Sequence, residues 1–446
     1  MRINRHQNVF VGFNLLLLGF IGIADSSGAM GHEVEDATEF RSLFDGSTLD
    51  GWHFRPHTNP FEFEALGEDE QDAKKAEYAK DGVTHWSVED GQIVNDGKGP
   101  FLVTDQAFEN YELHLQYNTV ANADSGIYLK DTPQVQIWDV TNESQFKHQN
   151  YRGSGGLWNN SAGAAGKDPL VMADRPLGQW NDVRVIQVGA RTSVYLNDQL
   201  VVDHALMENY WNRDKPIKRR GHIQLQTHGG EIRWRNIHIK SLSADQANEI
   251  LQSHQSVAYR SLINDPNTFE GWAGTVDDYQ INDGIIKCRP GRGGNLFTKE
   301  EFGNFSVRLK FKLPPGGNNG LAIRYPGKGN PAYDAMCEIQ VLDTEHPKFK
   351  SIDPRQAHGS VYGMVAPDRG YLRDNDEWNF QQVDVTGSTV RVELNGYEIL
   401  KADLSEVTEF MGDTPHPGKD RTTGHFGFAG HSDPVEFKDV QVRKLP

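Results

Sequence analysis

Acidic and amide side chains recur along one strand-like segment near residue 340. Glu338 and Gln340 stand two positions apart, so a β-strand would place both on one face. Asp343 is at an odd offset and reaches that face only if a bulge intervenes. An earlier segment has the same pattern with an amide in the first position, as Gln134, Gln136 and Asp139. A carboxyl group beside amides can transfer protons or bind a polar ligand, although the polar face of an ordinary strand would look the same.

Two histidines and two cations occupy equivalent positions in these two parts of the chain. His228 and His431 stand at the ends of strand-like runs, where an imidazole could act as a base, bind a sugar or a metal ion, or only complete a turn. Lys130 and Arg324 close two other strand-like runs. A cation there could orient a polyol, stabilise an enolate or pair with a strand carboxylate.

Tryptophan is concentrated in the first half of the chain, where seven of the nine Trp precede residue 242. Trp158 and Trp211 are expected in loops. An exposed indole ring can stack on the apolar face of a sugar while nearby amides bind the hydroxyl groups. Each Trp taken alone is equally consistent with a place in the core.

Motifs for other chemistries are missing. The sequence has no P-loop, no GxGxxG after a strand, no HExxH and no GxSxG elbow. A divalent metal ion could polarise a substrate carbonyl at such a cluster, but no ligand spacing requires one. We therefore expect no cofactor and assign no metal ligands.

The elements that must position these residues occur twice. Residues 102–130 align without a gap on residues 296–324, with six identities, and further matches follow in the same order. The repeat predicts one domain over residues 40–242 and a second over 259–446. Residues 243–258 between them predict a short helical linker capped by a serine.

Alternation of apolar and polar residues predicts the fold class. Residues 111–117 and 305–311 alternate with period two, and Asn-Asp or Asn-Gly turn signals follow similar runs. We expect an all-β protein with two tandem antiparallel β-sandwiches. An insertion in the first copy, residues 64–80, is charged and predicts a solvated surface helix.

Composition and the N-terminal segment limit the partners and the compartment. The 446 residues include 45 Lys and Arg against 62 Asp and Glu, a net charge of −17, which argues against nucleic acid as the main partner. Residues 1–29 have the pattern of a signal peptide, so we expect a secreted or periplasmic protein that is not embedded in a membrane once processed. The alternative is an uncleaved anchor helix, since the apolar run approaches the length that spans a membrane. Cys288 and Cys337 could form one disulfide or remain free thiols.

Six segments of the first copy together resemble a known family. They are residues 40–52, 86–91, 125–130, 135–139, 180–181 and 225–237. The sequence resembles the 3-keto-disaccharide hydrolase domain family, once in each copy. The resemblance implies two concanavalin A-like jelly rolls with a carbohydrate substrate.

The same resemblance implies cleavage of glycosides already oxidised at C3 of the sugar. A ketone at C3 acidifies the proton on C2, so a positioned base can remove it. The oxygen on C1 then leaves by elimination, and addition of water completes a net hydrolysis. Because the chain has no dinucleotide motif, a separate sugar oxidoreductase of the same pathway would supply the oxidised substrate.

Residue roles in the second copy also follow from the resemblance. Glu338 or His431 would be the base, and Arg324 would stabilise the enolate. Asp343 would act as an acid or an orienting group. The second copy retains the family's Glu and Arg at positions 338 and 324, where the first copy has Gln134 and Lys130.

In the first copy, His228 remains as the base, supported by Asp139 and Lys130. The copy retains the family's Gln226-x-His228 pattern, where the second copy has Ala429 before its histidine. Across both copies, the residues expected to bind substrate are Lys130, Gln136, Trp158, Trp211, Arg235, Asn318, Gln340 and Tyr362.

Two other functions fit the same residues. One is a non-catalytic carbohydrate-binding protein with two lectin-like sandwiches, which the loss of an acid at Gln134 and the Trp-rich first copy favour. The other is a glycosidase of the laminarinase type. A retaining mechanism of that type needs two carboxyl groups about 5–5.5 Å apart, and Gln340 counts against it.

Overall fold

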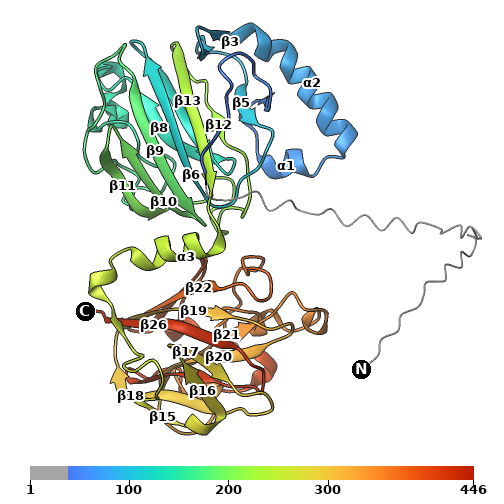
Figure 1. Ribbon diagram of the computed structural model, residues 1–446, viewed down its shortest axis with the longest axis vertical. Coiled ribbons are helices and arrows are strands. Elements are labelled where there is room, and N and C mark those ends of the chain that lie inside the picture. The colour runs from blue at the N-terminus through green and yellow to red at the C-terminus, as the bar shows by residue number, and fades with distance from the viewer. Residues whose placement is uncertain (1–38) are drawn as a thin grey trace, which may run out of the picture. The chain divides into compact units, whose positions relative to one another are not determined.

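The computed structural model describes residues 39–446, which form two antiparallel β-sandwiches (Figure 1). Sandwich 1 precedes helix α3 (Ala244–Ser253) in the chain, and sandwich 2 follows it. The expected all-β class with two concanavalin A-like jelly-roll sandwiches is confirmed. The signal peptide expected over residues 1–29 lies outside the described residues. Among residues 39–446, no helix is both long and apolar enough to cross a bilayer.

Sandwich 1 packs a large sheet on a small one. The large sheet has the order β11-β10-β9-β6-β13-β4-β3, with β1 paired to β13. Its strands are β1 (Arg41–Ser42), β3 (Trp86–Glu89), β4 (Gln92–Asn95), β6 (Tyr111–Thr119), β9 (Asn181–Val188), β10 (Arg191–Leu196), β11 (Gln199–Leu206) and β13 (Ile232–Ser241). The small sheet, ordered β2-β5-β12-β7-β8, consists of β2 (Trp52–Arg55), β5 (Phe101–Thr104), β7 (Asp124–Leu129), β8 (Thr132–Trp138) and β12 (Gln224–Leu225).

Sandwich 2 has the same two layers. Its large sheet, ordered β24-β23-β22-β19-β26-β17-β16 with β14 on β26, consists of β14 (Arg260–Ser261), β16 (Tyr279–Asn282), β17 (Ile285–Cys288), β19 (Phe305–Lys312), β22 (Asn379–Thr386), β23 (Thr389–Leu394), β24 (Tyr397–Asp403) and β26 (Glu436–Lys444). The small sheet, ordered β15-β18-β25-β20-β21, consists of β15 (Trp272–Gly274), β18 (Asn295–Phe302), β20 (Asn318–Tyr325), β21 (Cys337–Leu342) and β25 (Gly424–Ala429). A short helix, α4 (Pro331–Asp334), lies between β20 and β21.

The strand order brings the candidate segments together. Strand β6 shows why the layers form, since its side chains alternate between buried and half-buried along all nine residues. In the small sheet of sandwich 1, β12, which leads to His228, lies beside β7, and β7 pairs with β8. In sandwich 2, β25 leads to His431 and lies beside β20, which pairs with β21. Segments more than 90 residues apart in the chain thus become neighbours on one sheet face.

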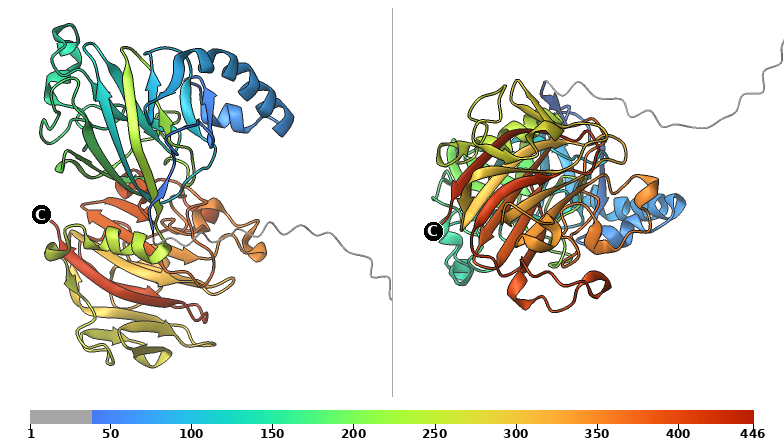
Figure 2. Two further views of the ribbon diagram at one scale, coloured as in Figure 1. Left: turned by 45° about the horizontal axis from the view of Figure 1, so that its top comes forward. Right: turned by 90° about the horizontal axis from the view of Figure 1, so that it is seen from below.

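The insertion in sandwich 1 forms two helices. They are α1 (Pro60–Glu64) and α2 (Glu68–His85), which extend beyond the single helix expected over residues 64–80 (Figure 2). Helix α2 approaches β2 closely because Gly82 has no side chain, and a Cβ there would lie 2.3 Å from the Phe54 ring. The helix is therefore anchored on the sandwich at its C-terminal end.

The segment between the sandwiches contains α3 with a capping box. The Ser243 hydroxyl accepts a hydrogen bond from the backbone N–H of Gln246, whose side chain accepts one from the N–H of Ser243. Ala247 and Leu251 on one helix face are buried in a small apolar cluster. In the described chain, Cys288 and Cys337 are both buried free thiols.

The two cations expected near a ligand are buried away from the polar face of the small sheets. Lys130 donates hydrogen bonds from Nζ to Gly189 O at 2.8 Å and to the Tyr397 hydroxyl at 2.9 Å. Arg324 donates from Nε to the carbonyl of Gly303 at 2.9 Å. Both have positive φ, 52° and 50°. Lys130 lies in the turn between β7 and β8, and Arg324 lies at a register shift between β20 and β25, so both side chains leave the regular alternation of the strands. Neither residue lines a pocket of its own sandwich.

Buried Lys130 makes stability depend on pH. Burial lowers the pKa of Lys130 to about 7 in the folded chain, whereas a lysine in an unfolded chain titrates near about 10.5. Folding therefore releases a proton between these values, and raising the pH through this window favours the folded state. We expect the melting temperature of the wild type to rise relative to that of Lys130→Met between pH 7 and 10, as measured by differential scanning fluorimetry. The exposed Lys401→Met is the control, and a constant gap between wild type and Lys130→Met across this range would contradict the expectation.

Candidate functional site

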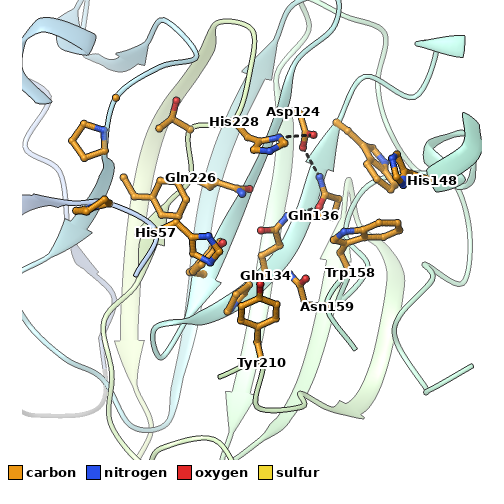
Figure 3. A pocket seen from close by; sticks show the side chains of 18 of the residues that line it. His57, Asp124, Gln134, Gln136, His148, Trp158, Asn159, Tyr210, Gln226 and His228 are labelled. Atoms are coloured by element: carbon orange, nitrogen blue, oxygen red, sulfur yellow. Dashed lines mark hydrogen bonds and ion pairs between the residues drawn. The ribbon is translucent and has the colours of Figure 1, made fainter. Parts of the chain in front are cut away.

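A cleft of about 980 Å³ opens on the small sheet of sandwich 1 (Figure 3). Strands β7 and β8 and the segment after β12 supply its polar floor. The residues of that floor are Asp124, Gln134, Gln136, Gln226, Thr227 and His228. The cleft thus gathers a carboxyl group, an imidazole and three amides in one place.

Asp124 and His228 form a hydrogen-bonded pair in this cleft. Nδ1 of His228 lies 2.8 Å from Oδ2 of Asp124, and Gln136 donates from Nε2 to the other carboxylate oxygen, also at 2.8 Å. Gln134 donates its amide to Oε1 of Gln136, which continues the chain of hydrogen bonds along β8. The hydrogen bond to Asp124 raises the pKa of His228 above its ordinary value. With Nδ1 committed to Asp124, Nε2 is the ring nitrogen that a ligand can reach.

Aromatic rings stand on both sides of this polar floor. Trp138 and Trp158 pack edge to face with centroids 5.1 Å apart, and Nζ of Lys167 lies 4.5 Å from the Trp158 ring centre. In Figure 3, His57 lies across the floor from Trp158. His57 is stacked on Phe101 at 5.8 Å. Two aromatic walls with amides between them suit a ligand that has apolar faces and polar edges, such as a sugar.

Helix α2 also contributes to the cleft. Glu77, Tyr78 and Asp81 are among its lining residues. The insertion was expected to form a solvated surface helix, with a functional lid as the alternative, and this side of α2 borders the cleft. The charge pattern indicated a helix, but the packing of Gly82 against Phe54 decides which side of it meets the sandwich.

A smaller pocket, of about 180 Å³, lies at the equivalent place on sandwich 2. Five of the residues expected at a site line it, namely Asn318, Glu338, Gln340, Tyr362 and His431. The remaining lining residues include Tyr333, Phe349 and Ile352. The pocket is therefore narrower and more enclosed by loop side chains than the cleft of sandwich 1.

Glu338 is a buried acid in this pocket. Only 3% of the residue is exposed, and burial raises the pKa of Glu338 to about 8. Nε2 of His431 lies 4.0 Å from Oε1 of Glu338, and burial lowers the pKa of His431 below its ordinary value. Near neutral pH, the pair therefore consists mainly of a protonated carboxyl group and a neutral imidazole.

Two details of the surroundings match this protonation state. A Cβ on Gly320 would lie 2.1 Å from Oε1 of Glu338, so the carboxyl group occupies space that only glycine leaves free. Gln340 donates from Nε2 to Oδ1 of Asn318 at 2.9 Å, while its buried Oε1 has no hydrogen-bond partner among the described residues. A protonated Glu338 would supply a donor close to this acceptor, as the amide of Gln134 does in sandwich 1.

Two carboxylates expected at a site instead stabilise turns. Asp139 accepts hydrogen bonds from the Thr141 hydroxyl at 2.6 Å and from the backbone N–H of Asn122 at 2.8 Å. Asp343 accepts one from the backbone N–H of Gly316 at 2.7 Å. Neither lines a pocket of its sandwich, because the odd offset from the site strand turns both toward the loop that precedes the neighbouring strand.

Arg235 and Trp211 also lie outside the cleft lining. Arg235 belongs to β13 of the large sheet, where its guanidinium lies 4.0 Å from the centre of the Trp180 ring. Trp211 donates from Nε1 to Asp131 O at 2.9 Å and packs behind His57, with ring centroids 5.1 Å apart. The structure thus gathers Gln136, Trp158 and His228 in the cleft of sandwich 1, places Trp211 behind the cleft wall and leaves Arg235 on the large sheet.

Sequence reasoning missed several residues of the cleft. Asp124 is the most important of them, and its signal was its alignment with Asn318 directly before the Ser-Gly pair. The others are His57, Phe101, Tyr128 and Tyr210. Most of these aromatic residues belong to separate loops or strand ends, which only the fold brings together.

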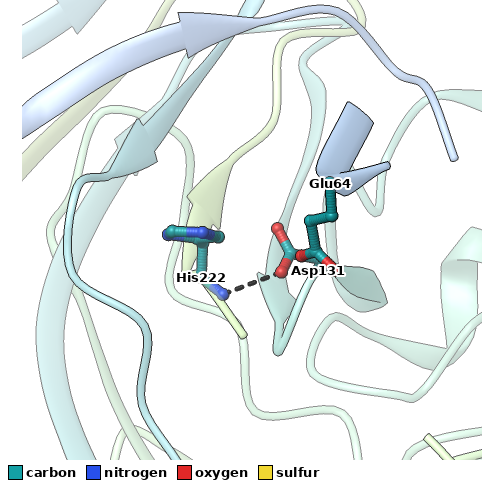
Figure 4. A group of neighbouring side chains, drawn as sticks. All are labelled: Glu64, Asp131 and His222. Carbon is teal, nitrogen blue, oxygen red and sulfur yellow. Dashed lines mark hydrogen bonds between the residues drawn. The ribbon is translucent and has the colours of Figure 1, made fainter. Parts of the chain in front are cut away.

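Glu64, Asp131 and His222 form a cluster that resembles a metal site (Figure 4). Their potential ligand atoms lie within 4.8 Å of one another. However, Lys218 forms ion pairs with both carboxylates, at 2.6 Å from Asp131, and Arg55 pairs with Asp131 as well. Nδ1 of His222 lies 2.7 Å from Thr104 O. The cluster is a network of ion pairs centred on buried Asp131, in which two cations already balance the acids.

Several known proteins are similar to parts of this chain. A 3-keto-disaccharide hydrolase of Bacteroides thetaiotaomicron is 28% identical over 247 residues, which cover 46% of this chain and 85% of that protein. A candidate glycosyl hydrolase from Parabacteroides distasonis has a crystal structure with 22% identity and a TM-score of 0.38, over 42% of this chain and 99% of that one. A carbohydrate-binding module from Bacillus subtilis, with 10% identity and a TM-score of 0.27, covers 39% of this chain and 96% of the module.

The family model described as a 3-keto-alpha-glucoside-1,2-lyase-like domain matches residues 39–240 and again residues 258–443. These two segments contain both pockets and nearly all of the described chain. The protein therefore belongs to the 3-keto-alpha-glucoside-1,2-lyase-like domain family.

Proposed function

We propose that this protein hydrolyses glycosides whose sugar carries a ketone at C3, and that the pocket of sandwich 2 transfers the protons. The observation that carries the proposal is the pairing of Glu338 with His431 across 4.0 Å, with pKa values displaced in opposite directions. Two titratable groups displaced in this way provide an acid and a base at the same pH. Family membership and the relative named 3-keto-disaccharide hydrolase support the choice of substrate.

The reaction begins at C2 of the oxidised sugar. Neutral His431 takes the proton from C2, and the electrons of that bond form an enolate with the C3 ketone. The enolate re-forms the ketone as the C1–O bond breaks, and protonated Glu338 gives its proton to the departing oxygen. Addition of water across the new C1–C2 double bond returns a proton at C2 and completes the hydrolysis.

The residues around the pair suit the binding of a sugar. Because Asn318 accepts from Gln340 through Oδ1, its own N–H groups stay available to a sugar oxygen. Tyr333 and Tyr362 pack edge to face with ring centroids 6.5 Å apart at the pocket wall. Among the lining residues in the described chain, Glu338 has the only carboxyl group, which argues against a retaining two-carboxylate glycosidase.

The proposal includes a partner and a compartment. A separate sugar oxidoreductase would form the C3 ketone, because this chain has no dinucleotide-binding motif. The charged and then apolar N-terminal segment supports export, so we propose that the hydrolysis takes place outside the cytoplasm.

A second candidate function is carbohydrate binding without catalysis. The cleft of sandwich 1 supports it, because two aromatic walls flank amides in a volume of about 980 Å³. Measured binding of unoxidised oligosaccharides, with no turnover of 3-keto-glycosides by the wild type, would favour this function over hydrolysis.

Removal of the acid from sandwich 2 should reduce turnover of a small substrate. We expect Glu338→Gln to lower kcat for methyl 3-keto-glucoside by about 10²- to 10⁴-fold, because the departing oxygen loses its proton donor. Initial rates of methanol release measure the effect. Glu345→Gln, whose side chain is 64% exposed three residues after the site strand, should behave as the wild type. Equal rates for Glu338→Gln and wild type would contradict the assignment.

The pH dependence should show two limbs for the same substrate. Activity requires neutral His431, so kcat/KM should fall only as the pH drops below the ordinary histidine range near 6.5. Activity also requires protonated Glu338, so it should fall again as the pH rises through about 8. A rate profile from pH 5 to 10 tests both limbs, and the residual activity of Glu338→Gln should lack the alkaline one.

A methyl group on Gly320 should displace the acid. The Cβ of Gly320→Ala would meet Glu338 at 2.1 Å, so we expect kcat for methyl 3-keto-glucoside to fall at least tenfold. Gly303→Ala is the control, because its Cβ would have its nearest neighbour at 3.8 Å. Circular dichroism should show that both variants are folded. An unchanged kcat in a folded Gly320→Ala would argue against this placement of the acid.

A further inference from the structure

The two pockets place their acid on different strands. Four equivalent positions form the polar core of each pocket, and two of them exchange an acid for an amide. Sandwich 1 has Asp124 at the start of β7 and Gln134 on β8, whereas sandwich 2 has Asn318 and Glu338 there. The equivalence follows from the strand register, since Gly126 pairs with Gln136 as Gly320 pairs with Gln340. At these four positions, each pocket thus keeps one carboxyl group.

The histidine pairs with the acid in both arrangements. His228 contacts Asp124 at 2.8 Å, and His431 has Glu338 as its acidic partner at 4.0 Å. The glutamine between the two positions is the same in both pockets, and it donates to Asp124 or to Asn318 at 2.8 and 2.9 Å. Sandwich 1 has Gln134 where sandwich 2 has a glutamate, but it still contains an acid–histidine pair. The acid of that pair is Asp124, which lies on β7 and not on β8.

The geometry of this pair is that of an oriented base. Asp124 engages Nδ1 of His228 and so selects the tautomer in which Nε2 carries the lone pair. The His228 side chain is 65% exposed at the cleft, so Nε2 can reach a ligand. Gln136 fixes the other carboxylate oxygen, which prevents Asp124 from rotating away.

A second observation points to a ligand at the same place. Gln226 lines the cleft two positions before His228, and only 7% of it is exposed. Its Oε1 has no hydrogen-bond partner among the described residues. The equivalent residue of sandwich 2 is Ala429, so this unpaired amide oxygen belongs to sandwich 1 alone. A sugar hydroxyl group would satisfy it.

The size of the cleft indicates a longer ligand than the pocket of sandwich 2 admits. Its volume of about 980 Å³ compares with about 180 Å³ in sandwich 2, and ligand sites for drug-sized molecules span about 300–1,000 Å³. Tyr128 and Tyr210 extend the wall that begins at His57, and Trp138 and Trp158 form the other. The walls can stack on more than one sugar ring.

We propose that the cleft of sandwich 1 is a second active centre, in which Asp124 and His228 cleave 3-keto-glycosides of two or more sugar rings. The proposal rests on the proposed function, since it uses the same oxidised substrates. The two sandwiches would then act on substrates with different numbers of sugar rings, and sandwich 2 would act on the small glycosides.

The reaction consumes no reactant other than the 3-keto-glycoside and water. Nε2 of His228 takes the proton from C2, and the electrons of that bond form the enolate of the C3 ketone. The N–H of Gln134 that is not donated to Gln136 would stabilise the enolate oxygen. As the ketone re-forms, the C1–O bond breaks and the departing oxygen takes the proton from His228. Water then adds to the C1–C2 double bond, which yields the free 3-keto sugar and the released alcohol.

The test compares two substrates in single variants of the full chain. The substrates are methyl 3-keto-glucoside and 3-keto-trehalose. We expect Glu338→Gln to lose turnover of the methyl glycoside and to retain at least half of the wild-type kcat for 3-keto-trehalose. His228→Gln should lower kcat for 3-keto-trehalose by about 10²- to 10⁴-fold. Asp124→Asn, which introduces the residue of sandwich 2, should lower it at least tenfold, and both should leave turnover of the methyl glycoside unchanged.

A matched pair elsewhere in sandwich 1 provides the control. Asp105 contacts Nδ1 of His53 at 2.8 Å outside the cleft lining, so Asp105→Asn should retain wild-type rates on both substrates. Far-ultraviolet circular dichroism should show that all variants are folded.

Three results would overturn the proposal in distinguishable ways. Loss of both substrates in Glu338→Gln would mean that sandwich 2 is the single active centre, with the proposed function intact. Binding of 3-keto-trehalose by sandwich 1 with unchanged turnover in His228→Gln would make the cleft a binding site only. A wild type that turns over neither substrate would refute the proposed function and the second centre together.

Discussion

In each sandwich, one glutamine amide links the polar side chains of two neighbouring strands by a hydrogen bond. Gln136 and Gln340 each donate to the side chain at the start of the neighbouring strand, at 2.8 and 2.9 Å. The amide can donate equally well to a carboxylate or to another amide, so the position it contacts can be Asp124 or Asn318. The acid can therefore lie on the strand beside the glutamine, as Asp124 does, or on the glutamine's own strand, as Glu338 does. The burial of the acid and its contact with the histidine depend on which of the two strands carries it.

The strand that carries the acid determines how exposed the carboxyl group is and which groups it contacts. Glu338 points into the space above Gly320, where it is nearly unexposed and no hydrogen bond between described residues offsets the loss of water. Asp124 stands at the strand end, where its side chain is 31% exposed and accepts from Gln136 beside His228. Burial therefore raises the pKa of Glu338 beside a neutral imidazole in sandwich 2, whereas in sandwich 1 the hydrogen bond to Asp124 stabilises the protonated form of His228. The same scaffold thus gives its two acid–histidine pairs different electrostatics.

The loops around the small sheets decide what each group can reach. In sandwich 1, α1 and α2 are inserted after β2, and α2 forms part of a wide cleft. In sandwich 2, Phe349, Ile352 and Tyr362 come from the segments after β21 and reduce the pocket to about 180 Å³. The strand order is the same in both sandwiches, so the difference in pocket size comes from the connections between strands.

The sequence by itself determined the strands, their class and the residues that share a strand face. Period-two alternation is a local property, and it placed Glu338 beside Gln340 and Gln134 beside Gln136 correctly. Only the tertiary structure decided which polar residues meet. Asp124 joins His228 from 104 positions away. Lys130 turns into the protein at the turn between β7 and β8, Arg324 does so at a register shift, and Asp139 and Asp343 stabilise turns. The physical reason is that contacts across a sheet depend on register, bulges and covering loops, which alternation within one segment does not encode.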